Sequence, residues 1–131
     1  MSTIEDFQLT DDAQLQTQLY VRAFNSGDFE TLERLYTEEA IAVWEPGRPL
    51  SGQARRDHIA ETLRAKPRMT ATDRHRYETG DATLLVVDWQ VEIAGADGEI
   101  EVHTGVGLDV LRRGEDGKWR YAIDDPYGES E

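Results

Sequence analysis

Three side chains, far apart in the sequence, have the chemistry that a proton transfer needs. Glu45 follows the apolar run 40–44 and directly precedes a proline. Asp109 falls in the middle of a predicted strand, where an unpaired carboxylate is costly to bury. Tyr20 lies on the apolar stripe of a predicted helix and carries a phenol that can donate a hydrogen bond. Removal of a proton next to a carbonyl group requires a carboxylate base and fixed hydrogen-bond donors.

Each of these three residues also has an ordinary structural interpretation. A tyrosine on the apolar stripe of a helix is commonly a core residue, and a glutamate before a proline commonly ends a strand in solvent. Asp109 would touch water if Gly105 and Gly107, on the same face of its strand, marked bulges. The sequence leaves both interpretations open, and Asp109 is the strongest single candidate.

Four further residues are expected to line a pocket for a small molecule: Trp44, Trp89, His103 and Asp124. The tryptophans are large enough to form a wall, although tryptophan is also a common core residue. The histidines of the chain do not have the spacing of metal ligands, so we expect neither a metal ion nor a cofactor.

The elements that must position these residues are helices in the first half of the chain and strands in the second. Apolar residues recur at helical spacing over 10–25, and Gly27 supplies a C-terminal cap. Asp28 then caps a second helix that extends to Tyr36, and a third helix lies between 51 and 67. Alternating patterns predict strands at 40–45, 69–79, 82–94, 99–113 and 118–125.

This order of elements predicts an α+β fold in which the helices cover one face of an antiparallel sheet. The length fits one domain over 1–131, with residues 1–9 as an N-terminal extension. A net charge of −13 disfavours nucleic acid as a partner, because the protein surface would repel phosphates. No apolar run is long enough for a membrane span, no secretion signal is recognisable, and cysteine is absent. We therefore expect a cytoplasmic protein that does not bind membranes.

The two faces of the last strands are expected to differ. One face collects the apolar residues Val106, Leu108, Val110, Trp119, Tyr121 and Ile123. The other face carries glycines and ionisable residues, so we expect it to be concave, with Gly105 and Gly107 leaving space above the strand. The apolar face would be a large exposed patch on a monomer, which predicts a homodimer packed sheet to sheet.

Three segments resemble the NTF2-like superfamily, also called cystatin-like or SnoaL-like: YVRAFNSGDFETLERLY, AIAVWEPGRPLSGQ and GLDVLRRGEDGKW. The resemblance implies a cone in which three helices pack on a strongly curved antiparallel sheet that encloses a pocket. The ending that runs from Trp119 to Gly128 resembles small bacterial proteins described as ketosteroid isomerase homologues.

Similarity to the ketosteroid isomerases implies a role for each of the three candidates. Tyr20 precedes a matching helical segment and would be one oxyanion donor. Asp109, within Leu108–Arg112, would be the second and must then be protonated. Glu45 takes the place of the general base. The implied protein is a cofactor-independent acid–base enzyme of the isomerase or lyase type, acting on a small hydrophobic or carbonyl-bearing molecule. The alternative is a non-catalytic domain for ligand binding, dimerisation or association.

Overall fold

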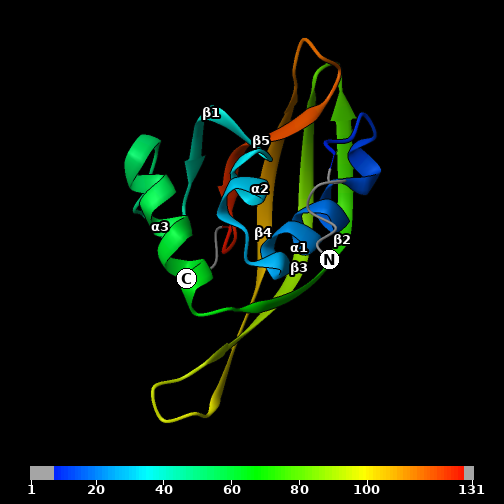
Figure 1. The fold of residues 1–131 in the computed structure, drawn as a ribbon. Helices are drawn as coiled ribbons and strands as arrows, with labels where there is room; N and C mark the ends of the chain where they lie inside the picture. The colour runs from blue at the N-terminus through cyan, green and yellow to red at the C-terminus, as the bar shows by residue number, and fades with distance from the viewer. Residues whose placement is uncertain (1–7, 129–131) are drawn as a thin grey trace.

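The computed structural model describes residues 8–128, in which short helices come first and long strands follow (Figure 1). The helical elements are η2 (Ala13–Leu15), α1 (Gln16–Ser26), α2 (Phe29–Glu33) and α3 (Gly52–Arg64). The strands are β1 (Tyr36–Ala42), β2 (Arg68–Thr79), β3 (Ala82–Ala94), β4 (Ile100–Arg113) and β5 (Trp119–Asp125). Of the predicted extension 1–9, only residues 8 and 9 are described, and Leu9 packs against the core.

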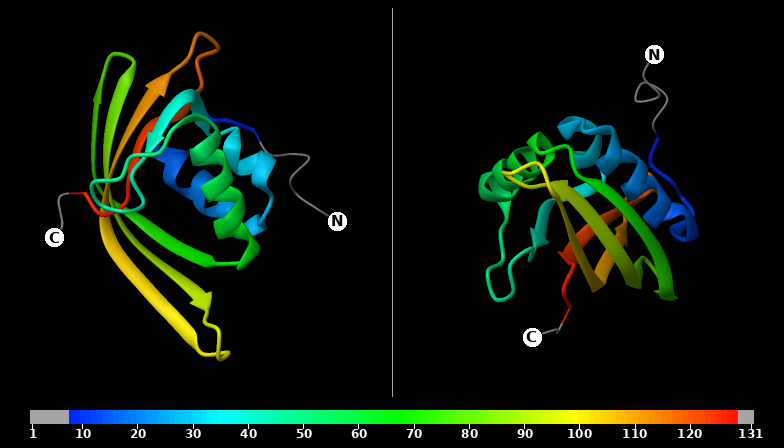
Figure 2. Two further views of the ribbon diagram at one scale, coloured as in Figure 1. Left: turned by 90° about the vertical axis from the view of Figure 1, so that its left-hand side faces the viewer. Right: turned by 90° about the horizontal axis from the view of Figure 1, so that it is seen from below.

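A single five-stranded sheet runs in the order β1-β5-β4-β3-β2. Its strands pair antiparallel except for β1, which lies parallel to β5 at the edge of the sheet. The sheet curves strongly, and the helices lie on its concave side (Figure 2). The predicted α+β class is confirmed, but the sheet is not antiparallel throughout, because β1 is parallel to β5. No helix within residues 8–128 is long and apolar enough to cross a membrane.

The tight connection between α1 and α2 forms as the sequence predicts. Gly27 ends α1 with a φ of 76°, a conformation that glycine adopts at little cost. Asp28 caps α2, and its side chain accepts a hydrogen bond of 3.0 Å from the backbone N–H of Thr31. Helix α1 starts later than predicted, because Asp12 rather than Thr10 caps the preceding 3-10 turn.

The core lies between the helices and the concave face of the sheet. Helices α1 and α2 contribute Phe24 and Leu32, and α3 contributes Ile59 and Leu63. The sheet contributes residues that are almost entirely buried: Leu85, Val87, Leu111, Trp119 and Tyr121. Burial of this apolar surface against the sheet is the main force that holds the helical layer in place.

The second helix is shorter than predicted, and Tyr36 belongs to β1 instead. Helix α2 ends at Glu33, and Tyr36 pairs with Tyr121 of β5 at the start of the parallel ladder. The backbone N–H of Tyr121 donates to the carbonyl of Leu35 at 2.7 Å. The predicted strand 40–45 ends early, at Ala42. Tyr36 therefore points from the sheet toward the concave side, where a helical position would not have placed it.

Two of the six residues predicted on the outer apolar face lie in the core. Trp119 and Tyr121 have exposed fractions of 3% and 2%. The cause is a bulge in β5: Val110 pairs with Ile123 but Leu111 pairs with Tyr121, so Ala122 is an extra residue. A one-residue shift moves every side chain beyond it to the opposite face. The prediction was wrong for Trp119 and Tyr121.

The glycines of β4 make room for side chains and backbone of the protein itself. A Cβ on Gly105 would lie 2.8 Å from Cζ2 of Trp89, so the indole ring packs directly on the strand. A Cβ on Gly107 would lie 3.2 Å from Cα of Pro126. The expectation of empty space was wrong for Gly105, because the Trp89 ring occupies it. Gly107, beside Pro126, also lines a cavity between the helices and the sheet.

Candidate functional site

A cavity of about 280 Å³ lies between the helices and the concave face of the sheet. Most of the lining is apolar and includes Val21, Phe24, Met69, Val87, Val91 and Ile93. The ionisable residues of the lining come from α1, α3, β4, β5 and the segment after β5: Tyr20, His58, His103, Asp109, Tyr121, Asp124 and Tyr127. The volume lies near the lower limit of about 300 Å³ for pockets that hold drug-sized ligands, so the cavity suits a small molecule.

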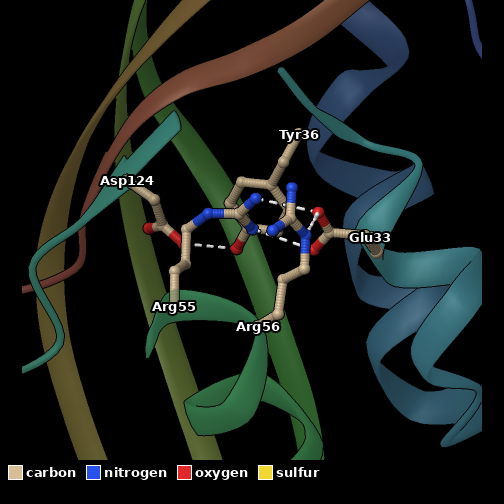
Figure 3. Close-up of polar contacts among 5 residues, drawn as sticks. All are labelled: Glu33, Tyr36, Arg55, Arg56 and Asp124. Atoms are coloured by element: carbon tan, nitrogen blue, oxygen red, sulfur yellow. Dashed lines mark hydrogen bonds and ion pairs between the residues drawn. The ribbon is translucent and has the colours of Figure 1, made fainter. Parts of the chain in front are cut away.

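Asp124 is the centre of a hydrogen-bond network at this cavity. Its Oδ2 accepts from the hydroxyl of Tyr36 at 2.7 Å and from Nε1 of Trp44 at 3.2 Å (Figure 3 shows the first contact). The hydroxyls of Tyr20 and Tyr36 lie 3.0 Å apart. Because Tyr36 has one hydroxyl hydrogen and gives it to Asp124, Tyr20 must be the donor to Tyr36.

Asp109 and Asp124 are cross-strand partners, and both buried carboxyl groups line the cavity. Two ionised carboxylates side by side in a buried site repel each other, which favours a proton on one of them. Oδ1 of Asp109 is buried and accepts no hydrogen bond from a donor group within residues 8–128. Asp124, in contrast, accepts two bonds from other residues. We assign the proton to Asp109 and the negative charge to Asp124.

The environment of the two carboxyl groups supports this assignment. Burial, followed by the negative charge of Asp124, raises the pKa of Asp109 well above the usual aspartate value. Burial also raises the pKa of Asp124, but the hydrogen bonds from Tyr36, Asp109 and Trp44 and the charge of Arg55 oppose that rise. Because each group shifts the pKa of the other, the two titrate as a pair.

The phenols beside the carboxyl pair remain neutral. Burial, followed by the charge of Asp124, raises the pKa of both Tyr20 and Tyr36 well above the ordinary tyrosine value. Burial, followed by the negative charge of the carboxyl pair, does the same for the pKa of Tyr121. The ring of Tyr20 packs edge-on against that of Tyr121, with centroids 5.1 Å apart. This packing holds the hydroxyls in fixed positions.

Glu45 does not face the cavity. The side chain is 68% exposed and pairs with Arg48, with Oε1 and Nη1 3.1 Å apart. Because β1 ends at Ala42, Glu45 falls in the turn that follows, where the N–H of Arg48 donates to its carbonyl at 2.9 Å. Glu45 therefore does not lie where a general base for a molecule in the cavity would have to be.

The four residues predicted to line a pocket all line the cavity. Trp44 is held there because the N–H of Val43 donates to the backbone carbonyl of Asp124 at 2.7 Å. Nε1 of Trp89 donates to the carbonyl of Pro126 at 2.7 Å. His103 is half exposed, and its Nε2 lies 3.6 Å from Oε1 of Glu101.

The structure adds residues that sequence reasoning did not assign to the site. Tyr36 was placed in a helix and Tyr121 on the outer face, because bulges in β1 and β5 interrupt the alternation. His58, which stacks on Trp44 with centroids 4.8 Å apart, carried no signal beyond its helix. Arg55 of α3 was not assigned to the site either. Its signal was the position on the apolar face of α3, four residues before Ile59.

The comparisons with known proteins agree with this architecture. Residues 17–122 match the family model of the SnoaL-like domain. The chain belongs to the SnoaL-like family. The predicted membership of the NTF2-like superfamily is thereby confirmed, and no curated protein sequence matches this SnoaL-like chain.

Solved structures similar to the SnoaL-like protein carry differing descriptions. A Xanthomonas campestris protein, provisionally described as a calcium/calmodulin-dependent protein kinase II association domain, has a TM-score of 0.74 at 13% identity, with 95% of this chain and 94% of that chain covered. A Streptomyces avermitilis protein, provisionally described as an NTF2-like dehydratase, has a TM-score of 0.71 at 22% identity, with 87% of this chain and 93% of that chain covered. A ketosteroid isomerase-like protein from Erwinia carotovora atroseptica has a TM-score of 0.67 at 21% identity, with 83% of this chain and 87% of that chain covered. At these identities the likeness is one of fold.

Proposed function

We propose that this SnoaL-like protein is a cofactor-independent acid–base enzyme that acts on a small, largely apolar molecule held in the cavity. The observation that carries the proposal is the pair of buried carboxyl groups, Asp109 and Asp124, on neighbouring strands in a largely apolar lining. One member carries a proton and the other can accept one. Such a pair can take a proton from one position of a substrate and return it at another, as isomerases and lyases require.

The roles we propose differ from those of the ketosteroid isomerases. In that arrangement a separate base faces two free donors, but here the donors converge on Asp124. Tyr20 gives its hydrogen to Tyr36, and Tyr36 gives its hydrogen to Asp124, so neither phenol is left free for a developing oxyanion. We therefore assign proton exchange to the carboxyl pair. Tyr20, Tyr36 and Trp44 hold Asp124 in place.

The charge of the site supports an uncharged substrate. The carboxyl pair holds one negative charge, and the whole chain carries −13, so an anion would be repelled. We propose a small hydrophobic compound with a carbonyl or similar group that makes a neighbouring C–H acidic. The enzyme would act in the cytoplasm as a homodimer.

A test does not require the natural substrate to be known. Small apolar ketones and enones are incubated with the protein in D₂O, and the exchange of acidic C–H hydrogens is followed by NMR. Wild-type protein should accelerate exchange for at least one compound. Asp109→Asn and Asp124→Asn should each reduce that rate by about 10²–10⁴-fold, the range for loss of a general acid or base.

The control is Glu61→Gln, which removes an exposed carboxylate of α3 and should leave the exchange rate unchanged. If the Asp109→Asn and Asp124→Asn proteins exchange the C–H hydrogens of the compound at the wild-type rate, the carboxyl pair does not carry out proton exchange.

The alternative is a non-catalytic domain that binds a ligand or another chain. The likeness to the Xanthomonas campestris protein, with its association-domain description, and the exposed apolar residues of the outer sheet face favour it. A binding domain would hold apolar compounds in the same cavity with equal affinity in wild-type and Asp109→Asn protein, and would exchange none of their hydrogens.

A further inference from the structure

We infer that the buried ion pair of Arg55 and Glu33 is a positioning device for the carboxyl pair: it orients Tyr36 and supplies the positive charge that keeps Asp124 ionised. The inference rests on the proposed role of Asp109 and Asp124 in proton exchange. Arg55 and Glu33 do not line the cavity and act through Tyr36.

The geometry of Arg55 is unusually well defined for an arginine. Its side chain is fully buried, and its Nη1 and Nη2 donate to the two carboxylate oxygens of Glu33 at 2.9 and 2.8 Å. The guanidinium carbon lies 4.7 Å from the centroid of the Tyr36 ring. Figure 3 shows this arrangement, with the hydroxyl of Tyr36 directed at Asp124 on the far side of the ring.

Stability alone does not account for a buried arginine at this position. Removing an ion pair from water costs several kcal/mol per ion, and an apolar pair of similar size commonly serves stability as well or better. Nε of Arg55 adds to the cost, because it is buried and has no hydrogen-bond partner within residues 8–128. The ion pair of Arg55 and Glu33 is better explained by its effect on Tyr36 and Asp124.

The charges around this pair are complementary to the carboxyl pair. Arg56 also contacts Glu33, with its Nε 3.2 Å from Oε2, so two arginines share one glutamate and leave one excess positive charge. The carboxyl pair holds one negative charge. Arg56 is 30% exposed and is screened by water, whereas Arg55 is not exposed. The excess positive charge that Asp124 experiences therefore comes from Arg55.

The other ionisable or donor groups that face Asp124 come from every element around it. They are Tyr20 of α1, Tyr36 of β1, Trp44 after β1, Asp109 of β4 and Tyr121 of β5, with Glu33 of α2 behind Arg55. Arg55 of α3 is the cation in this set, and its charge lowers the pKa of Asp124. A cation over the Tyr36 ring also fixes the plane of the phenol, whose hydroxyl donates to Asp124.

The test is an NMR titration of protein labelled with ¹³C at the aspartate carboxyl carbons, which needs no substrate. Loss of the cation in Arg55→Met should raise the lower pKa of the carboxyl pair by about 0.5–1 unit, less than the roughly 1–3 units of a direct charge contact. Glu33→Gln should lower the same pKa, because Arg55 then loses its counter-charge. Arg56→Met is the matched control, and in this variant the lower pKa of the carboxyl pair should stay at the wild-type value.

Shifts of the same sign in Arg55→Met and Glu33→Gln, or no shift in folded Arg55→Met, would overturn the inference. Should Arg55→Met fail to fold, Glu33→Gln decides the question, since it keeps a hydrogen-bond acceptor for Arg55, and an unchanged pKa there overturns the inference. The titration is independent of turnover. A protein with these shifts but no C–H exchange retains the positioning role and loses the proposed enzyme activity.

Discussion

At the residue scale, the chemistry of the site depends on which carboxyl group holds the shared proton. Asp109 is the protonated member, because its buried Oδ1 accepts no hydrogen bond from another donor in residues 8–128 and burial raises its pKa. Asp124 is the ionised member, because Tyr36 and Trp44 both donate to it. This assignment has a consequence for the pH dependence of stability.

An isosteric neutral residue should replace Asp109 without loss of stability. In the unfolded chain Asp109 ionises near the usual value of about 3.9, whereas in the folded protein its pKa is raised. The stability that a raised carboxyl pKa contributes is fully present below about pH 4 and is lost as the pH rises toward the folded-state value. Asp109→Asn does not titrate and avoids this loss. It should therefore be more stable than wild type at pH 7, with the difference vanishing near pH 4.

Urea unfolding at several pH values measures this difference directly. Asp88→Asn serves as the control, because Asp88 is partly exposed and forms an ion pair of 2.6 Å with Arg74. Loss of this ion pair should lower the free energy of unfolding by between about 0 and 1 kcal/mol, opposite in sign to the effect at Asp109. An Asp109→Asn protein that is less stable than wild type at pH 7 would mean that Asp109 is ionised in the fold.

Residue types identified most of the site, and long-range pairing supplied the rest. Tyr20, Asp109 and Asp124 were found from the sequence because an ionisable group on an apolar stripe or strand face needs a partner. Tyr36 was missed, since its orientation depends on parallel pairing with a strand more than eighty residues away in the chain. Glu45 was misplaced for a related reason, because the end of β1 is set by that same pairing.

At the scale of elements, the sequence predicted which segments form helices and strands but not where two strands bulge. Caps at Gly27 and Asp28 act through neighbouring residues, so local reasoning found them. The bulge at Ala122 depends on the register between β4 and β5, and it reverses the faces of Trp119 and Tyr121. Alternation within one strand carries no information about a bulge that its partner imposes.

The close packing of Trp89 on β4 gives a prediction about this element. In Gly105→Ala the new Cβ would lie 2.8 Å from Cζ2 of the indole, and a ring held by a hydrogen bond to Pro126 cannot move freely. We expect a loss of about 1–3 kcal/mol, typical of overpacking, together with a change in tryptophan fluorescence.

Gly114→Ala is the control for this substitution. Its Cβ would approach Nη1 of Arg120 at 2.9 Å and Oδ1 of Asp116 at 3.0 Å, but both atoms are at the ends of side chains rather than in a packed ring or the backbone. Urea unfolding should show a smaller loss for Gly114→Ala than for Gly105→Ala. Equal losses would mean that Trp89 does not constrain the strand.

At the scale of the whole molecule, the convex face of the sheet is more apolar than a solvated surface requires. We call the residues that share this face the outer patch: Ile41, Tyr77, Leu84, Val86, Val106, Leu108, Val110 and Ile123. Ile41, Tyr77 and Ile123 are 38%, 57% and 39% exposed. The patch lies opposite the helices and the cavity, so a second copy could cover it without blocking the proposed site (Figure 2).

We therefore expect a homodimer with a mass of twice 14.9 kDa, packed through the outer patch. Val110 is central to the patch, since it pairs with Leu84 on one side and Ile123 on the other. In Val110→Glu a charge would be buried in the interface without a partner, and the dimer should dissociate. Leu15→Glu introduces the same charge on an exposed residue of the helical layer and should remain dimeric. Light scattering at micromolar concentration distinguishes the two masses, and a monomer mass for wild-type protein would remove the outer patch as an interface between copies.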